Sequence, residues 1–291
     1  MNLEQAETLR SEGLELILSN EPERAREKFD AAALLTDDDE LLELITINRG
    51  SASIRLEDYE SPDVKALPAI VMRRRSARHT YLAAYHLCDY FGRTGRIDRA
   101  RHYGQIALEA ALDSDRHDSI ENALTSLGNV EIFDSNFDLA ASYYERALAQ
   151  IPEGPEHEFR RAVLHQNLGY TRIQQEDPEA GVHLLLQALD ELKRSGSGFV
   201  AESYIDLCNG FLDLDRLTEA KMYGELGLEH LTDRRQERNV HYLLGEIAHR
   251  SGDRERAEYH FEYLASFYPD FPHLKSLLYS VDLRKMVNWK L

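Results

Sequence analysis

Residues 121–154 read ENALTSLGNVEIFDSNFDLAASYYERALAQIPEG. Apolar residues recur in this stretch at intervals of three, four and seven, the pattern of amphipathic helices. Ser135 lies between the two apolar runs, where a helix must end and the chain must reverse. The small residues Gly128 and Ala140 allow the two helix backbones to approach closely. The stretch therefore predicts a pair of antiparallel helices.

The same pattern recurs in register along the chain. A small marker residue follows each predicted turn: Ala25, Ala100, Ala140, Gly181, Ala220 and Ala257. Twelve residues earlier stands a second small residue: Gly13, Cys88, Gly128, Gly169, Cys208 and Gly245. The turn, five residues before the marker, holds Asn20, Gly95, Ser135, Glu176, Asp215 and Gly252. No segment shows sustained period-two alternation, so the chain is predicted to be all-α.

These residues carry a family resemblance. Leu127-Gly128, Ala140, Tyr144, Ala147 and Pro152 resemble a tetratricopeptide repeat, and so do Leu244-Gly245, Gly252-Asp253, Ala257, Phe261 and Pro269. The resemblance implies a right-handed superhelical solenoid of antiparallel helix pairs, whose first helices line a concave groove. It also implies a protein-binding rather than a chemical function.

The repeats are longer than the usual 34 residues. Ala100 and Ala140 lie 40 residues apart, and the next three steps are 41, 39 and 37. This spacing resembles the long-helix tetratricopeptide arrays of bacterial peptide-sensing regulators and of some polarity adaptors. We expect one array over residues 1–291, with repeats at about 5–38, 81–115, 121–154, 162–195, 201–234 and 238–271. An irregular or degenerate repeat is expected at 39–80 and a capping helix at 272–288.

Composition narrows the function further. The chain has 34 Lys and Arg against 52 Asp and Glu, a formal net charge of −18. A surplus of acids argues against nucleic-acid and anionic-membrane partners, because phosphate contacts need Lys and Arg. Two cysteines cannot form a disulfide framework, and neither a signal peptide nor a membrane span is apparent. A cytoplasmic location is expected.

Charge is unevenly distributed in residues 37–102. Residues 37–63 are strongly acidic, whereas residues 72–102 carry eight arginines, including the cluster Arg73, Arg74, Arg75 and Arg78. We interpret these arginines as partners of the neighbouring acids rather than as a nucleic-acid site. Helices are expected at about 39–58 and 64–93.

At the C-terminus, a helix is expected from Pro272 to about Met286, with Lys275, Asp282, Arg284 and Lys285 on its solvent face. Trp289 is interpreted as a packing residue of this cap. A homodimer through Trp289 or the 64–78 helix remains open.

Motifs for chemistry are lacking. The twelve histidines do not follow metal-ligand spacing, and Gly196-Ser-Gly198 follows a helix rather than the strand that a dinucleotide site requires. Cys88 and Cys208 share the small-residue column of repeats three units apart and are interpreted as unpaired packing residues. No enzyme activity, cofactor or metal is expected.

The residues predicted to line the groove flank the second small residue of each repeat, the one twelve positions before the marker. Asparagine gathers there, although it is a poor helix former. Its amide both donates and accepts, so a row of asparagines can bind the backbone of an extended peptide. The candidate ligand-binding residues are Asn122, Ser126, Asn129, Phe133, Asn167, Tyr170, Asn209, Tyr85, His86 and Arg93. The same columns contain Asp206, Asp213, Asn239, Glu246 and Arg250.

Two features refine this groove. Asn129 and Asn167 match the asparagines of the family's carboxylate clamp, but Thr125, Ser203 and Asp206 stand where its basic residues belong. A C-terminal carboxylate is therefore not expected in the middle of the groove. An acidic group of the ligand is instead expected near His86 and Arg93.

The sequence predicts a non-catalytic scaffold or adaptor that binds an extended peptide or a partner helix. The alternative is a peptide-responsive cytoplasmic regulator that acts through a partner protein. An enzyme is the third and weakest hypothesis.

Overall fold

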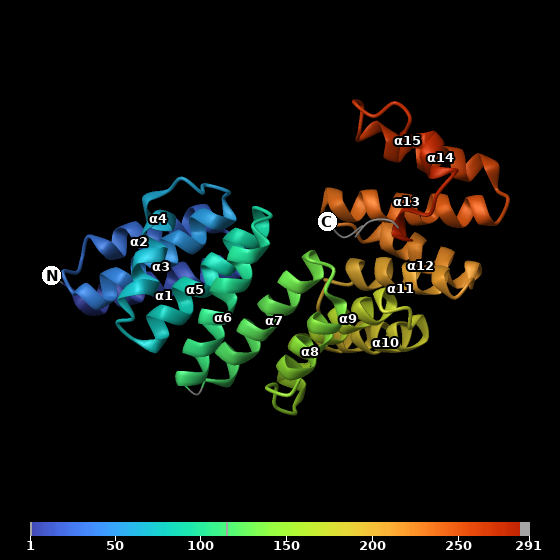
Figure 1. Cartoon of the computed structure of the whole chain (residues 1–291). Helices are drawn as coiled ribbons and strands as arrows, with labels where there is room; N and C mark the ends of the chain where they lie inside the picture. Colours follow the sequence, from blue (N-terminus) through green and yellow to red (C-terminus); the bar gives the residue numbers. More distant parts are fainter. Residues whose placement is uncertain (1, 115, 286–291) are drawn as a thin grey trace. The chain divides into compact units, whose positions relative to one another are not determined.

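The computed structural model describes residues 2–114 and 116–285. It divides into two compact units, residues 1–130 and 131–291. Within the described residues every regular element is helical (Figure 1), as predicted.

The first unit consists of helices joined by short turns. They are α1 (Leu3–Leu18), α2 (Pro22–Ala33), α3 (Asp39–Arg55), α4 (Pro62–Arg73), α5 (Ala77–Arg93), α6 (Ile97–Asp113) and most of α7 (His117–Phe133). Helix α1 packs against α2, α3 against α4, and α5 against α6. Residues 39–80 therefore contain a pair of packed helices, α3 and α4.

The second unit continues the pattern. Its elements are α8 (Phe137–Leu148), η1 (Pro155–His157), α9 (Glu158–Gln174), α10 (Pro178–Arg194), α11 (Ala201–Asp213), α12 (Leu217–Glu229), α13 (Arg234–Arg250), α14 (Arg254–Ser266), α15 (Leu274–Leu278) and η2 (Leu283–Lys285). Helix α9 packs against α10, α11 against α12, and α13 against α14.

Small residues set the spacing within these hairpins. A Cβ on Gly245 of α13 would lie 2.4 Å from the Phe261 ring of α14, and a Cβ on Gly13 of α1 would lie 2.4 Å from the Phe29 ring of α2. Both phenylalanines are fully buried. The aromatic rings thus occupy the space that the missing side chains leave, which explains the small-residue column of the sequence.

The Arg-rich segment pairs with acids, as the sequence predicted. Glu43 of α3 is buried. Its carboxylate lies 3.0 Å from Arg73 Nη1 and within hydrogen-bond distance, 2.8 Å, of His79 Nδ1. Arg75 Nε lies 3.7 Å from the same carboxylate. A buried carboxylate requires such partners, and these contacts tie α3 to the α4–α5 junction.

The single helix expected at 64–93 is wrong. Helix α4 ends at Arg73, and Arg74 adopts a left-handed conformation with φ 48°. The side chain of Ser76 then accepts a hydrogen bond from the His79 N–H and caps α5. Ser76 therefore starts a new helix, so α4 and α5 are two separate helices.

The capping helix expected at 272–288 also differs. Helix α15 spans only Leu274–Leu278, and a separate turn, η2, follows. Leu274 and Leu278 are buried, as a cap requires. Beyond them, Asp282 and Arg284 make tertiary contacts that a continuous helix with these residues in solvent would not allow. Residues 286–288 and Trp289 lie outside the described residues.

Candidate functional site

The first helices of successive hairpins lie side by side in the second unit. Helix α11 packs against both α9 and α13. We call the surface formed by α9, α11 and α13 the first-helix face. It carries the columns from which the sequence predicted a groove.

Polar side chains of α11 are buried on this face. Ser203, Asp206 and Asn209 recur every three residues, and none is more than 1% exposed. The Ser203 hydroxyl donates a hydrogen bond to Gln166 Oε1 of α9 at 2.7 Å. Burial of polar groups costs free energy unless they find partners. The face is therefore built for polar contacts rather than for apolar packing alone.

Glu202 joins α11 to the start of α13. Its carboxylate accepts hydrogen bonds from Arg235 Nη2 at 2.9 Å and from Gln236 Nε2 at 3.2 Å. Burial lowers the pKa of Arg235, but the hydrogen bond and charge of Glu202 outweigh it and hold the pKa above its ordinary value. These contacts fix the mutual position of the two helices that carry most of the face.

The end of the described chain lies on the same face. Arg284 of η2 places its guanidinium against α11: Nη1 lies 3.0 Å from Asn209 Oδ1 and 3.0 Å from Asp213 Oδ1. The side chain is only 2% exposed. A buried guanidinium needs such acceptors, because desolvation without partners is costly.

Asp282 makes the matching contacts with α13. Its carboxylate accepts hydrogen bonds from the Tyr242 hydroxyl at 3.0 Å and from Arg250 Nη2 at 2.8 Å, and it also pairs with Arg284. Burial raises the pKa of Asp282, but the hydrogen bond and charge of Arg284 outweigh it and hold the pKa below its ordinary value. Arg250 is held in turn by Glu246, at 2.6 Å on the same helix.

In the first unit, α5 and α7 bring several predicted residues together. The Tyr81 hydroxyl is hydrogen-bonded to Ser119 and Asn122, and the Tyr85 hydroxyl to Ser126. Burial raises the pKa of both tyrosines, so both stay neutral. The contacts Tyr81–Asn122 and Tyr85–Ser126 thus join adjacent first helices through polar groups.

The expected site for an acidic group near His86 and Arg93 is not supported. Arg93 is exposed, but its Nε is 2.9 Å from Asp89 Oδ1 of the same helix. Burial lowers the pKa of His86 to about 4, an effect that Arg55 adds to and Asp89 opposes. At neutral pH the imidazole carries no charge and the guanidinium already has a carboxylate partner.

The ten predicted residues differ in exposure. Asn122, Asn129, Arg93 and Phe133 are exposed, and Ser126, Asn167, Tyr85 and His86 are half-buried. Tyr170 and Asn209 are buried. Tyr170 is part of the core of the second unit and offers no apolar surface pocket, whereas Asn209 is covered by Arg284. Asn129 and Asn167 belong to different units, so neither unit contains the expected asparagine pair.

Sequence reasoning missed Tyr242, Asp282 and Arg284. Asp213 and Arg250 stood in the groove columns and were a usable signal. Asp282 and Arg284 were expected on the solvent face of a helix. That expectation is wrong, because Arg284 is buried against Asn209, a residue 75 positions earlier in the chain.

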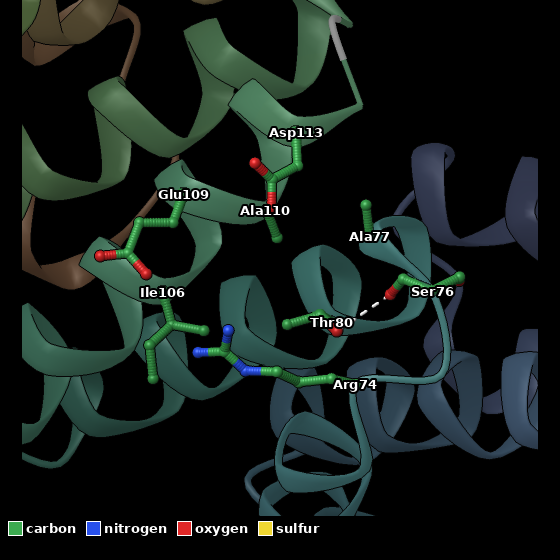
Figure 2. A pocket seen from close by; sticks show the side chains of 8 residues that line it. All are labelled: Arg74, Ser76, Ala77, Thr80, Ile106, Glu109, Ala110 and Asp113. Carbon is green, nitrogen blue, oxygen red and sulfur yellow. Dashed lines mark hydrogen bonds between the residues drawn. The ribbon is translucent and has the colours of Figure 1, made fainter.

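Two cavities lie away from this face. One, of about 140 Å³, is lined by Arg74 and the start of α5 on one side and by Ile106, Glu109 and Asp113 of α6 on the other (Figure 2). Its charged residues are all exposed. The second, of about 260 Å³, lies among α12, α13 and α14. Neither gathers buried polar groups as the first-helix face does.

Neither a metal-binding cluster nor a membrane-spanning helix is found in the described part of the chain. Over residues 2–114 and 116–285, no three His, Cys, Asp or Glu side chains are grouped so that they could hold a metal ion. None of the helices described there has both the length and the apolar character needed to span a membrane. Cys88 and Cys208 are buried and unpaired, and burial raises the pKa of both thiols.

Comparison with known proteins places the fold. No protein-family model matches the sequence, and no curated protein matches it. A tetratricopeptide repeat protein from Parabacteroides merdae ATCC 43184 superimposes with a TM-score of 0.58 at 16% identity, over 95% of this chain and 98% of that one.

Two other solved structures fit more closely in shape. A Rap protein complexed with Competence and Sporulation Factor gives a TM-score of 0.71 at 15% identity, over 97% of this chain and 79% of that one. NprR in complex with its cognate peptide NprX gives 0.71 at 13% identity, over 99% and 84%. By fold, this chain is a tetratricopeptide-type helical repeat protein.

Proposed function

We propose that this protein is a non-catalytic adaptor that binds an extended peptide or a partner helix on the face formed by its first helices. The observation that carries the proposal is the set of buried polar groups on that face. Repeat arrays bind their ligands on extended surfaces of this kind.

Two asparagine amides give the strongest support for ligand binding on this face. The Nδ2 atoms of Asn209 on α11 and Asn239 on α13 are buried, and neither finds a hydrogen-bond acceptor among the residues that the structure describes. A buried donor without a partner costs about 1–3 kcal/mol. A carbonyl oxygen of a bound peptide would accept a hydrogen bond from such a donor, so peptide binding would recover this free-energy cost.

The structural neighbours agree with this class of ligand. NprR was solved with its cognate peptide, and Rap with Competence and Sporulation Factor. Their folds superimpose over nearly the whole of this chain. A peptide-responsive regulator that acts through a partner protein is therefore the second candidate function. Both functions use the same face, so one experiment tests the binding that they share.

The experiment is affinity recovery of the tagged protein from its native cells, with one variant of the first helices in each unit. Asn122→Ala/Asn129→Ala alters α7 in the first unit, and Asn167→Ala/Asn239→Leu alters α9 and α13 in the second. Asn209 is left intact because it holds Arg284. Gln105→Ala and Gln187→Ala are the matched controls, since these exposed amides lie on the second helices α6 and α10.

A partner that the wild type and both controls retain, and that one face variant loses, supports the proposal and identifies the unit that holds the ligand. A partner that all five proteins retain would place binding elsewhere and overturn the proposal. Circular dichroism of each variant verifies that the helices are intact.

A further inference from the structure

The contacts of residues 282–284 on the first-helix face have the character of a bound ligand. The guanidinium of Arg284 is held by two acceptors on α11, Asn209 and Asp213. The carboxylate of Asp282 is held by two donors on α13, the Tyr242 hydroxyl and Arg250. The helices thus present an acceptor pair for a cation and a donor pair for an anion, spaced to match side chains two residues apart.

The backbone of the segment is recognised as well. The Leu283 N–H donates a hydrogen bond to the Tyr242 hydroxyl at 2.8 Å. The Arg284 side-chain atom Nη1 also lies 3.4 Å from the backbone carbonyl oxygen of Asn209 on helix α11. These are the contacts that a groove makes with an extended peptide: main-chain hydrogen bonds together with pockets for particular side chains.

The segment is weakly attached otherwise. Between α15 and η2 the chain has no regular structure, and Val281, Asp282 and Leu283 are only half-buried. Leu283 touches the edge of the core, whereas the apolar anchors Leu274 and Leu278 come earlier. Segments with few buried apolar contacts open at a small fraction of the global unfolding free energy. Release of residues 281–285 would leave α11 and α13 intact.

We propose that Asp282-Leu283-Arg284 is an intramolecular ligand of the α11–α13 part of the first-helix face. This part of the face is a receptor for a short segment with a carboxylate and a guanidinium two residues apart. An external ligand of that chemistry binds there by displacing the chain's own segment. The inference rests on the proposed function only in treating this face as the one that ligands use.

The chain supplies its own probe, a fluorescein-labelled peptide of residues 280–285, SVDLRK. The full-length variant Asp282→Ala/Arg284→Ala vacates the receptor. We expect the peptide to bind this variant at least tenfold more tightly than it binds the wild type, by fluorescence anisotropy. The peptide SVALAK, which lacks the carboxylate and the guanidinium, should bind neither protein.

Two further proteins make the result specific. Adding Asp213→Asn to the vacated variant should weaken peptide binding at least tenfold, because the guanidinium loses its carboxylate. The control Arg216→Ala/Glu219→Ala, made in the wild type, removes an exposed acid–arginine pair at the start of α12, and it should bind the peptide as weakly as the wild type does. Equal binding to the wild type and the vacated variant would overturn the proposal, and so would no binding to the vacated variant.

A measurement on the wild type covers the case in which the vacated variant folds poorly. In native-state hydrogen exchange, the Leu283 amide should open at least a hundredfold more often than the amides of α11. Exchange of Leu283 together with α11 would show a structural cap and overturn the proposal. Peptide binding by the vacated variant would stand even if no cellular partner depends on the asparagines, so the two proposals can fail separately.

Discussion

At the residue scale, two glycines determine how closely α9 and α10 pack. A Cβ added to Gly181 would lie 2.7 Å from the backbone carbonyl oxygen of Gly169, and one added to Gly169 would lie 2.9 Å from that of Gly181. Backbone atoms cannot move aside as a flexible side chain can. These two positions therefore tolerate no side chain.

Gly181→Ala should lower the free energy of unfolding by about 1–3 kcal/mol, the usual cost of overpacking. Gly92→Ala is the matched control, because Gly92 also lies in a helix and its Cβ would meet no atom within 4 Å. This control should be neutral or stabilising by up to about 1 kcal/mol, through the lower entropy of the unfolded chain. Urea denaturation measures both. Equal effects of the two substitutions would contradict the close-approach explanation.

A pair of histidines gives the second prediction at this scale. His260 Nδ1 of α14 lies 3.1 Å from His241 Nδ1 of α13. Burial, with the charges of His241 and Arg256 adding to it, lowers the pKa of His260 to about 4. In the unfolded chain a histidine titrates near pH 6.5. The unfolded state therefore binds more protons between these values, so titration of His260 has no effect on stability above about pH 6.5 and destabilises the fold progressively as the pH falls toward 4.

His260→Gln should remove this dependence. When the pH is lowered from 7.5 to 5.5, the wild type should lose stability relative to the variant, as measured by urea denaturation at each pH. A difference between the two proteins that stays constant over this range would show that His260 does not resist protonation in the folded state.

At the element scale, the turn column explains how each first helix ends. All six residues that the sequence placed at these turns have positive φ: Asn20, Gly95, Ser135, Glu176, Asp215 and Gly252. A left-handed residue after the last helical turn satisfies terminal carbonyl groups and reverses the chain. Only two of the six are glycine, so the remaining four bear a conformational cost.

Glu176→Gly should therefore stabilise the protein by up to about 1 kcal/mol, because glycine adopts this conformation without a Cβ clash. Gly95→Ala is the converse: its Cβ would meet no atom within 4 Å, so a loss of about 1 kcal/mol would report backbone strain alone. Thermal unfolding of both variants is the measurement. A stabilising Gly95→Ala would refute the assignment.

Helix pairs and their turns were predictable because each depends on residues within about forty positions. The break at Arg74 was missed because no Gly or Pro marks it, and the signal from Ser76 is a single hydroxyl. The fate of Asp282 and Arg284 was not predictable from local pattern, because their partners lie on α11 and α13, and such distant polar contacts leave no periodicity in the sequence. Arg284 overrides the local preference for a longer α15.

At the scale of the whole molecule, part of the candidate site was predictable and part was not. The columns flanking the small residues included Asn209, which lies on the first-helix face, and Asp213, Glu246 and Arg250 stand in the same columns. They did not distinguish an exposed position such as Asn129 from a buried one such as Tyr170. Exposure on one helix depends on how neighbouring helices pack, and the repeat pattern records only which residues face the partner helix.

The central claim is that ligands bind to the first helices, and site-specific photo-crosslinking tests it most directly. A benzophenone amino acid replaces Asn129 or Asn167 on first helices, and Gln105 or Gln187 on second helices, in the native cells. We expect a crosslinked partner, identified by mass spectrometry, to form from position 129 or 167 and not from 105 or 187. Crosslinking confined to positions 105 and 187 would contradict it.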